Sequence, residues 1–292
     1  MELHWPLIIF TTLIAWSAGL FATQCIFALK GGAKKAQKPA WIVAAILLVV
    51  GGIAVFFHLG NAGRIFNGFG HLSSGITQEL IFMVVLAVVA VIYLVLMLRS
   101  EDRASVPAWI AIVGIIASAA LVFIMAHSYL MAARPAWNSF LWVLYVLGNA
   151  CAFGPATLAA LMAAKGDDMS GVGIVVLVGT LVALVTAVAY AIFVQTSGGN
   201  FAEIGNYMFD SAFPNREIPN AAAALSGVAG LLWGGAVAVG AVVPAVLAFV
   251  AKGKTDKSWL MWGCIIAALV LIGAICMRLV FFKMGLGVFM FF

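Results

Sequence analysis

Long apolar runs, separated by short polar segments, dominate the pattern of this 292-residue chain. About 20 apolar residues, rising about 1.5 Å each along a helix, cross a hydrocarbon core of about 30 Å. Eight runs reach that length, so the pattern predicts eight membrane-spanning helices. Their predicted bounds are Trp5–Leu29, Trp41–Leu59, Glu79–Leu98, Pro107–Ala132, Phe140–Ala164, Gly171–Gln195, Ala221–Ala251 and Trp259–Phe282.

Composition agrees with an all-α polytopic integral membrane protein. Hydrophobic residues make up 65% of the chain and charged residues 9%, and the mean hydropathy is +1.18. No stretch is polar enough for a soluble domain, so we expect residues 1–292 to form a single membrane domain. No Lys or Arg precedes Lys30, which favours a retained first helix over a secretory signal.

The basic residues predict an orientation. Ten Lys and Arg residues lie in the loops after the first, third, fifth and seventh spans, and five lie at the opposite ends of the helices. Because cytoplasmic loops carry the excess of Lys and Arg, both termini are expected on the extracytoplasmic side. The basic pI of 9.1 therefore reports membrane orientation and does not point to nucleic acid.

Four cysteines lie inside apolar runs and form no CxxC pair. We interpret them as small core residues. Zinc or iron–sulfur ligation within this chain is not expected. They are Cys25, Cys151, Cys264 and Cys276.

Ionisable side chains gather toward one end of the predicted bundle. The direction of each span brings five of them to the extracytoplasmic side, with Arg64 and His71 in the loop above. Charged groups in a membrane cost about 2.5–3.5 kcal/mol each on insertion scales, so they tend to persist where they pair or do chemistry. We therefore predict one polar pocket at this end. The five are His58, Glu79, His127, Tyr129 and Arg278.

Each of these residues also has a simpler explanation. His58 can cap a helix before Gly60, and Glu79 can be a first-turn acid favoured by the helix dipole. His127 and Tyr129 can be interfacial residues, and Arg278 can extend its side chain to lipid headgroups. The convergence of all five favours a pocket over five separate explanations.

Such a pocket suits the oxidation of a quinol, whose two hydroxyls lose protons as two electrons leave. A neutral histidine or a carboxylate can accept a proton, and an arginine can hold an anion or polarise an oxygen. Two alternatives stay open. His58 and His127 are the pair that could ligate a haem, as in a cytochrome b-like subunit, and a secondary transporter is the other class. Transporters usually place polar groups at the midplane, where this chain has few.

Three further segments carry weaker signals. The connection Thr196–Asn220, rich in acidic and aromatic residues, is either a solvated loop or a docking surface for a partner. The GLLWG segment Gly230–Gly234 predicts close helix packing. Pro155 predicts a kink in the fifth span.

Several segments resemble the membrane anchor subunit of anaerobic dimethyl sulfoxide reductases, within the wider family of haem-free quinol-interacting polytopic subunits of molybdenum oxidoreductases. The His58-Leu59-Gly60 segment together with Glu79 is the most specific part of the likeness. The segments that carry it are HWPLIIFTTLIAWSAGLF, HLGNAGRIFNG, SSGITQEL, YLMAARPAWNS and GAICMRLVFF.

This resemblance implies a subunit of the bacterial cytoplasmic membrane that binds menaquinol and carries no haem. It would pass two electrons to an iron–sulfur subunit, which feeds a molybdopterin catalytic subunit, so the chain alone would hold no complete active site. His58 and Glu79 would bind and deprotonate the quinol, with Arg64 and Tyr129 as supporting contacts. The last helix departs from the family pattern, with Ala274 in place of a carboxylate and Phe282 in place of a tyrosine, so the role of Arg278 is open.

Overall fold

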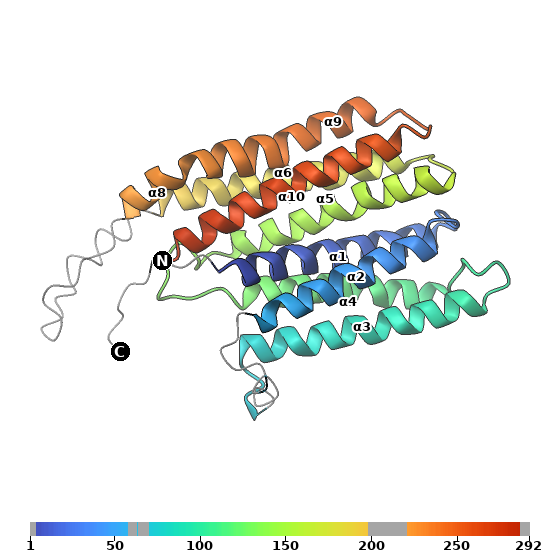
Figure 1. Ribbon diagram of the computed structural model, residues 1–292, viewed down its shortest axis with the longest axis horizontal. Coiled ribbons are helices and arrows are strands. Elements are labelled where there is room, and N and C mark those ends of the chain that lie inside the picture. The colour runs from blue at the N-terminus through green and yellow to red at the C-terminus, as the bar shows by residue number, and fades with distance from the viewer. Residues whose placement is uncertain (1–3, 58–62, 64–69, 198–220, 287–292) are drawn as a thin grey trace, which may run out of the picture.

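The computed structural model describes residues 4–57, 63, 70–197 and 221–286 and is all-helical over that range. The helices run up and down in one elongated bundle, and the first described helix begins at the same end where the last one ends (Figure 1). The described part of the chain holds eight helices long and apolar enough to cross a membrane, which confirms the predicted fold class. Seven of them are α1 (Trp5–Leu29), α2 (Gln37–Phe56), α3 (Gly75–Arg99), α4 (Ala108–His127), α5 (Phe140–Lys165), α6 (Val172–Thr196) and α10 (Trp259–Lys283).

The remaining span consists of three consecutive helical segments. It begins as α8 (Ala221–Ala229), widens to a π-helix, η2 (Gly230–Val242), and returns to an α-helix in α9 (Val243–Ala251). Pro244 follows the π-helix directly, where its missing N–H removes a hydrogen bond from the helix. The predicted bounds of this span are confirmed, and the change of helix type inside it was not predicted.

Helix boundaries near the site differ from the predictions. The second helix begins at Gln37 and ends at Phe56, whereas the predicted bounds were Trp41–Leu59. The fourth helix ends at His127, five residues earlier than predicted, and Tyr129 lies in the connection to α5. In the sequence, apolar residues continue past both helix ends. Hydropathy alone therefore does not mark where either helix stops.

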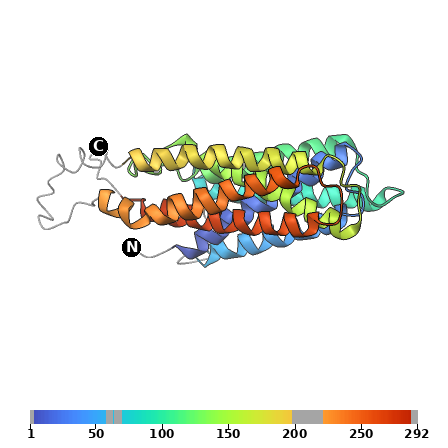
Figure 2. The same ribbon diagram turned by 90° about the horizontal axis from the view of Figure 1, so that it is seen from above.

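The helices form two groups around a central pair. Helices α1 and α5 lie side by side in the middle and are the most buried spans. On one side, α2 and α4 pack on α1, and α3 packs on α4; on the other, α6 and α10 pack on α5, and the α8–η2–α9 span packs on α6 and α10 (Figures 1 and 2). Helix α2 packs mainly on α1 and touches α3 only lightly, which leaves room between α2 and α3.

The predicted close packing at Gly230 and Gly234 is wrong. A Cβ atom built on either glycine would meet open space among the described residues. The close contacts of this span with α10 lie at Gly235, where a Cβ would lie 2.5 Å from Sγ of Cys276, and at Gly240, where a Cβ would lie 2.2 Å from the Cα of Gly273. The spacing of two glycines indicates a small-residue face, and only the tertiary arrangement decides which glycines meet a neighbour.

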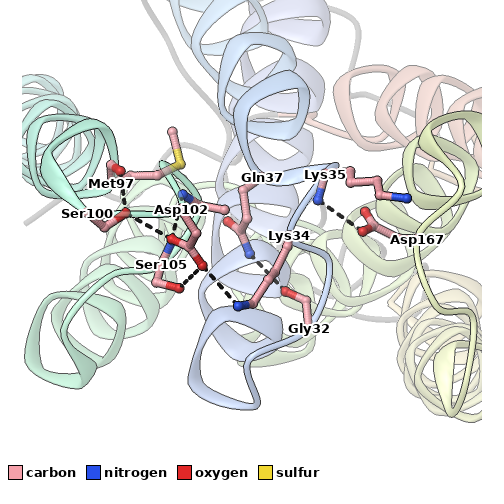
Figure 3. A network of polar contacts seen from close by, with 10 residues as sticks. Gly32, Lys34, Lys35, Gln37, Met97, Ser100, Asp102, Ser105 and Asp167 are labelled. Atoms are coloured by element: carbon pink, nitrogen blue, oxygen red, sulfur yellow. Dashed lines mark hydrogen bonds and ion pairs between the residues drawn. The ribbon is translucent and has the colours of Figure 1, made fainter.

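We call the two ends of the bundle the terminal end, where α1 begins and α10 ends, and the basic end, which holds the loops 30–36, 100–107, 166–171 and 252–258. At the basic end the α1–α2 loop is bound to two others (Figure 3). Lys34 pairs with Asp102 at 2.9 Å, and the backbone N–H groups of Lys35 and Ala36 donate to the Asp167 carboxylate at 2.9 and 2.7 Å. These contacts hold three short loops together without burying a charge in the bundle.

Candidate functional site

Glu79 lies one turn inside α3 at the terminal end, with 8% of its surface exposed. The helix begins at Gly75, so Glu79 is its fifth residue, and the first turn of α3 holds no acid. The simpler explanation of Glu79 as a first-turn acid is therefore wrong. A carboxyl group in this position is removed from water and needs a hydrogen-bond partner.

Ser128, just past the end of α4, supplies that partner. Its hydroxyl donates to Oε1 of Glu79 and also lies 2.9 Å from the carbonyl of Met125. When Glu79 is ionised, the hydroxyl can donate to the carboxylate. When Glu79 is protonated, the serine oxygen can accept from the carboxylic acid and donate to Met125. The pair is therefore satisfied in both protonation states of Glu79.

Close packing of α3 against the end of α4 makes this contact possible. A Cβ atom on Gly75 would lie 2.7 Å from the Cβ of Ser128, closer than real side chains approach. Only glycine at the start of α3 lets the two segments come this near. The connection after Ser128 is in turn fixed to α10, because the Trp137 indole stacks on Phe281 with ring centroids 4.5 Å apart and its N–H donates to the Phe281 carbonyl at 2.6 Å.

A cleft of about 320 Å³ opens beside Glu79, between α2 and α3, with α1 as its floor. Among the described residues that line it, Glu79 is the one ionisable side chain. Several lining residues, including Phe56, Ile76 and Val84, are also exposed on the outer surface of the bundle, so the cleft opens sideways toward lipid. The lining residues are Phe10, Leu48, Val49, Gly52, Ile53, Val55, Phe56, Ile76, Glu79, Leu80, Met83, Val84 and Ala87.

Arg278 forms a second buried polar centre that does not line this cleft. Its side chain is fully buried in α10. The guanidinium donates to the Thr11 hydroxyl at 2.8 Å and to the Thr11 carbonyl at 3.2 Å. It also donates to Asn149 Oδ1 at 3.4 Å and to the Ala274 carbonyl at 3.1 Å. Full burial excludes the explanation that Arg278 extends to headgroups, and the bonds join α1, α5 and α10.

Tyr129 lies beside the terminal-end aromatic residues. Its ring packs edge-on against Phe281 at 5.8 Å and against Trp137 at 6.2 Å. Burial raises the pKa of the Tyr129 phenol well above its usual value; the charge of Glu79 raises this pKa further, and that of Arg278 lowers it. A phenol in this state stays protonated and can donate a hydrogen bond.

The other predicted residues are placed differently. The His127 side chain is exposed and stacks on Phe123, with ring centroids 5.8 Å apart. It therefore points to the outer surface of the bundle and not into the cleft. His58, Arg64 and residues 198–220 of the connection predicted as a docking surface lie outside the described residues. The predicted gathering at one end is found for Glu79, His127, Tyr129 and Arg278, but the structure divides them among a cleft, a buried cluster and the surface.

Comparison with known families decides what this bundle is. The family model of the DMSO reductase anchor subunit (DmsC) matches residues 1–286. The chain belongs to the DMSO reductase anchor subunit family. No curated protein sequence matches it.

Membership of the anchor family confirms the resemblance found in the sequence and indicates the complex in which the chain works. An anchor subunit is a multi-pass membrane protein that serves a reductase with catalytic and iron–sulfur subunits. The eight apolar helices agree with that role. In this anchor subunit the roles of Glu79, Tyr129, His127 and Arg278 in quinol chemistry stay predictions.

Several residues at the site of this anchor subunit were not found from the sequence. Ser128 stands between the two residues that were selected, His127 and Tyr129, and a serine in an apolar protein gives little signal. Gly75 and Gly52 are small residues in a chain with 30 glycines, so nothing marked them. The buried partners of Arg278 are threonine and asparagine, which are common in helices as structural residues.

Proposed function

We propose that this anchor subunit binds a quinol of the menaquinol type with its ring beside Glu79, oxidises it, and passes the electrons to the iron–sulfur subunit of the complex. One observation carries the proposal: a buried carboxyl group, held by Ser128, is the one ionisable side chain among the described residues lining an apolar cleft that opens toward lipid. Quinols are dissolved in the lipid, so a lateral opening suits their access.

The chemistry requires two proton acceptors and one electron acceptor. Oxidation breaks the two O–H bonds of the quinol and releases two protons and two electrons. Glu79 takes one proton through the oxygen that Ser128 leaves free. His58, which the family resemblance implicates in deprotonation and which lies outside the described residues, takes the other. The electrons leave to an iron–sulfur cluster in the partner subunit. Phe10 and Phe56 supply flat apolar walls for the ring.

The proposal includes an orientation. The basic end faces the cytoplasm, so the terminal end, Glu79 and the partner subunits lie on the extracytoplasmic side. Quinol protons are then released on the side where the electrons are used. Turnover of the complex therefore moves no net charge across the membrane.

Exchange of Glu79 for its amide tests the site. We expect Glu79→Gln to lower quinol-dependent reduction by the complex at least about a hundredfold, because a positioned proton acceptor contributes about that much or more. Reduction driven by a viologen, which feeds electrons directly to the partner subunits, should be unchanged. Glu101→Gln makes the same chemical change at an exposed position of the basic end and should leave both activities unchanged. Near wild-type quinol-dependent activity in Glu79→Gln would refute the assignment.

The orientation has its own test. Complexes reconstituted in liposomes with a potential-sensitive dye should turn over quinol without a dye response. A membrane potential that builds up during turnover and collapses with an ionophore would contradict this orientation, because it would mean that protons are released on the side opposite to the one where the electrons are used.

A further inference from the structure

The cleft beside Glu79 continues into a second hollow, deeper in the bundle. This hollow has a volume of about 220 Å³ and lies between the same two helices, α2 and α3, again with α1 as its floor. Leu48, Val49 and Ala87 line both volumes. The two hollows are therefore consecutive parts of one groove, which we call the α2–α3 groove.

The groove is long and narrow. It runs along α2 from Phe56 beside the site to Trp41 near the basic end, a rise of about 22 Å at about 1.5 Å per residue. Small residues create its width: Gly52 and Ala45 on α2, and Ala87 and Ala90 on α3. A leucine at any of these positions would fill the space that the groove now leaves.

Its polarity changes along its length. Glu79 marks the terminal end, whereas the deep part presents only satisfied polar groups among its described residues. The Ser17 hydroxyl donates to the Ala44 carbonyl at 2.7 Å, and the Trp41 indole donates to the Ala90 carbonyl at 2.8 Å. The latter bond also ties α2 to α3 and closes the groove at its deep end. A ligand that matches this profile has one polar end and a long apolar chain.

We propose that the α2–α3 groove holds the polyprenyl tail of the quinol, with the tail running from the ring beside Glu79 toward Trp41. The proposal rests on the quinol site proposed above and extends it. The tail lies along a surface of Val, Leu and Ala side chains, and the open side of the groove lets it enter laterally from the bilayer. The groove thereby makes the enzyme selective for quinols with long tails and fixes the angle of the ring at the carboxyl group.

Filling the deep part of the groove at Ala90, which does not line the cleft beside Glu79, tests this assignment with two substrates. We expect Ala90→Phe to raise KM for a menaquinol with a long tail roughly tenfold, a typical discrimination by an apolar pocket. KM for a naphthoquinol without a tail should stay within about twofold. Ala45→Leu, which narrows only the deep part, should affect long tails and spare quinols with one prenyl unit. Ala268→Leu adds the same bulk at an exposed position of α10 and serves as the control.

Photolabelling of the wild-type complex tests the position of the tail without using any variant, so poor folding of a variant cannot affect the result. A quinone with a photoreactive group at the end of its tail should label α2 and α3 near Trp41 and Ala90, and a group next to the ring should label near Phe56 and Met83. Labelling at unrelated helices, or an equal effect of Ala90→Phe on tailed and tailless quinols, would overturn the tail assignment and leave the groove to a lipid chain. The quinol site itself would still stand in that case, provided Glu79→Gln blocks oxidation of both substrates.

Discussion

The two ends of the bundle handle charge in opposite ways. At the basic end, charges sit in short exposed loops and bind other loops, as Lys34 binds Asp102. At the terminal end, Glu79 and Arg278 are buried inside helices and are held by uncharged groups from other segments. Acidic and basic side chains thus connect exposed loops at one end and form buried polar centres at the other.

The difference shows where to look for function in a membrane protein. Exposed ion pairs contribute little, because water screens them and ordering two side chains costs entropy. A buried ionisable group costs several kcal/mol unless its partners compensate, so its presence needs a reason. Glu79 has such a reason in the cleft that it lines. Arg278 has one in the three helices that it joins.

The largest effect should come from removing Arg278. In Arg278→Ala the Thr11 and Asn149 oxygens lose their donor and a cavity opens among α1, α5 and α10. Loss of buried hydrogen bonds and packing of this size costs about 3–5 kcal/mol. We expect a lower midpoint of thermal unfolding in detergent and less complex in the membrane.

Arg278→Lys separates charge from geometry. Lysine keeps the charge but cannot reach all of these acceptors with one ammonium group. An intermediate unfolding temperature would show that the geometry of the guanidinium matters. Wild-type stability in both variants would mean that the buried cluster does not hold the bundle together.

A smaller effect is expected from Ser128. In Ser128→Ala the Glu79 carboxyl group loses its partner, so it is less well held for proton transfer. A hydrogen bond to a charged group is worth about 1.5–3 kcal/mol, so the quinol-dependent kcat should fall roughly tenfold or more. Stopped-flow quinol oxidation measures it. Ser226→Ala is the matched control, since this exposed serine makes the same bond to the carbonyl three residues earlier without touching a carboxylate. An unchanged rate in Ser128→Ala would break the link between this serine and the chemistry.

The smallest effect should appear at the basic end. The Ser105 hydroxyl, Lys34 and the Ala104 N–H hold the pKa of Asp102 well below its usual range. Because the pKa is lower in the folded state, the contribution of Asp102 to stability is present above the pKa of the unfolded chain and is lost only as the pH falls through the folded value. Thermal unfolding of Asp102→Asn and wild type should coincide at very low pH and differ slightly near neutral pH. A neutral-pH loss as large as that of Arg278→Ala would contradict the contrast between the two ends.

Much of the fold could be predicted from the sequence, because a helix that crosses the bilayer must be long and apolar enough to span the hydrocarbon core. Helix length and apolarity are local properties, so the span Trp5–Leu29 has the bounds that its pattern predicted. Helix ends were less predictable. Apolar residues continue past Phe56 and His127, and only the path of the next connection decides where the helix stops.

The sequence by itself determined the number of spans, the up-and-down order and the end of the bundle that carries Glu79 and Arg278, since each follows from hydropathy and direction along the chain. Only the tertiary structure decided which side chains meet. It turned His127 outward, gave Glu79 a serine and a groove, and gave Arg278 neutral partners from α1 and α5. The physical reason is that such contacts depend on how each helix is rotated about its axis and on which small residues meet a neighbouring helix. The sequence pattern alone specifies neither.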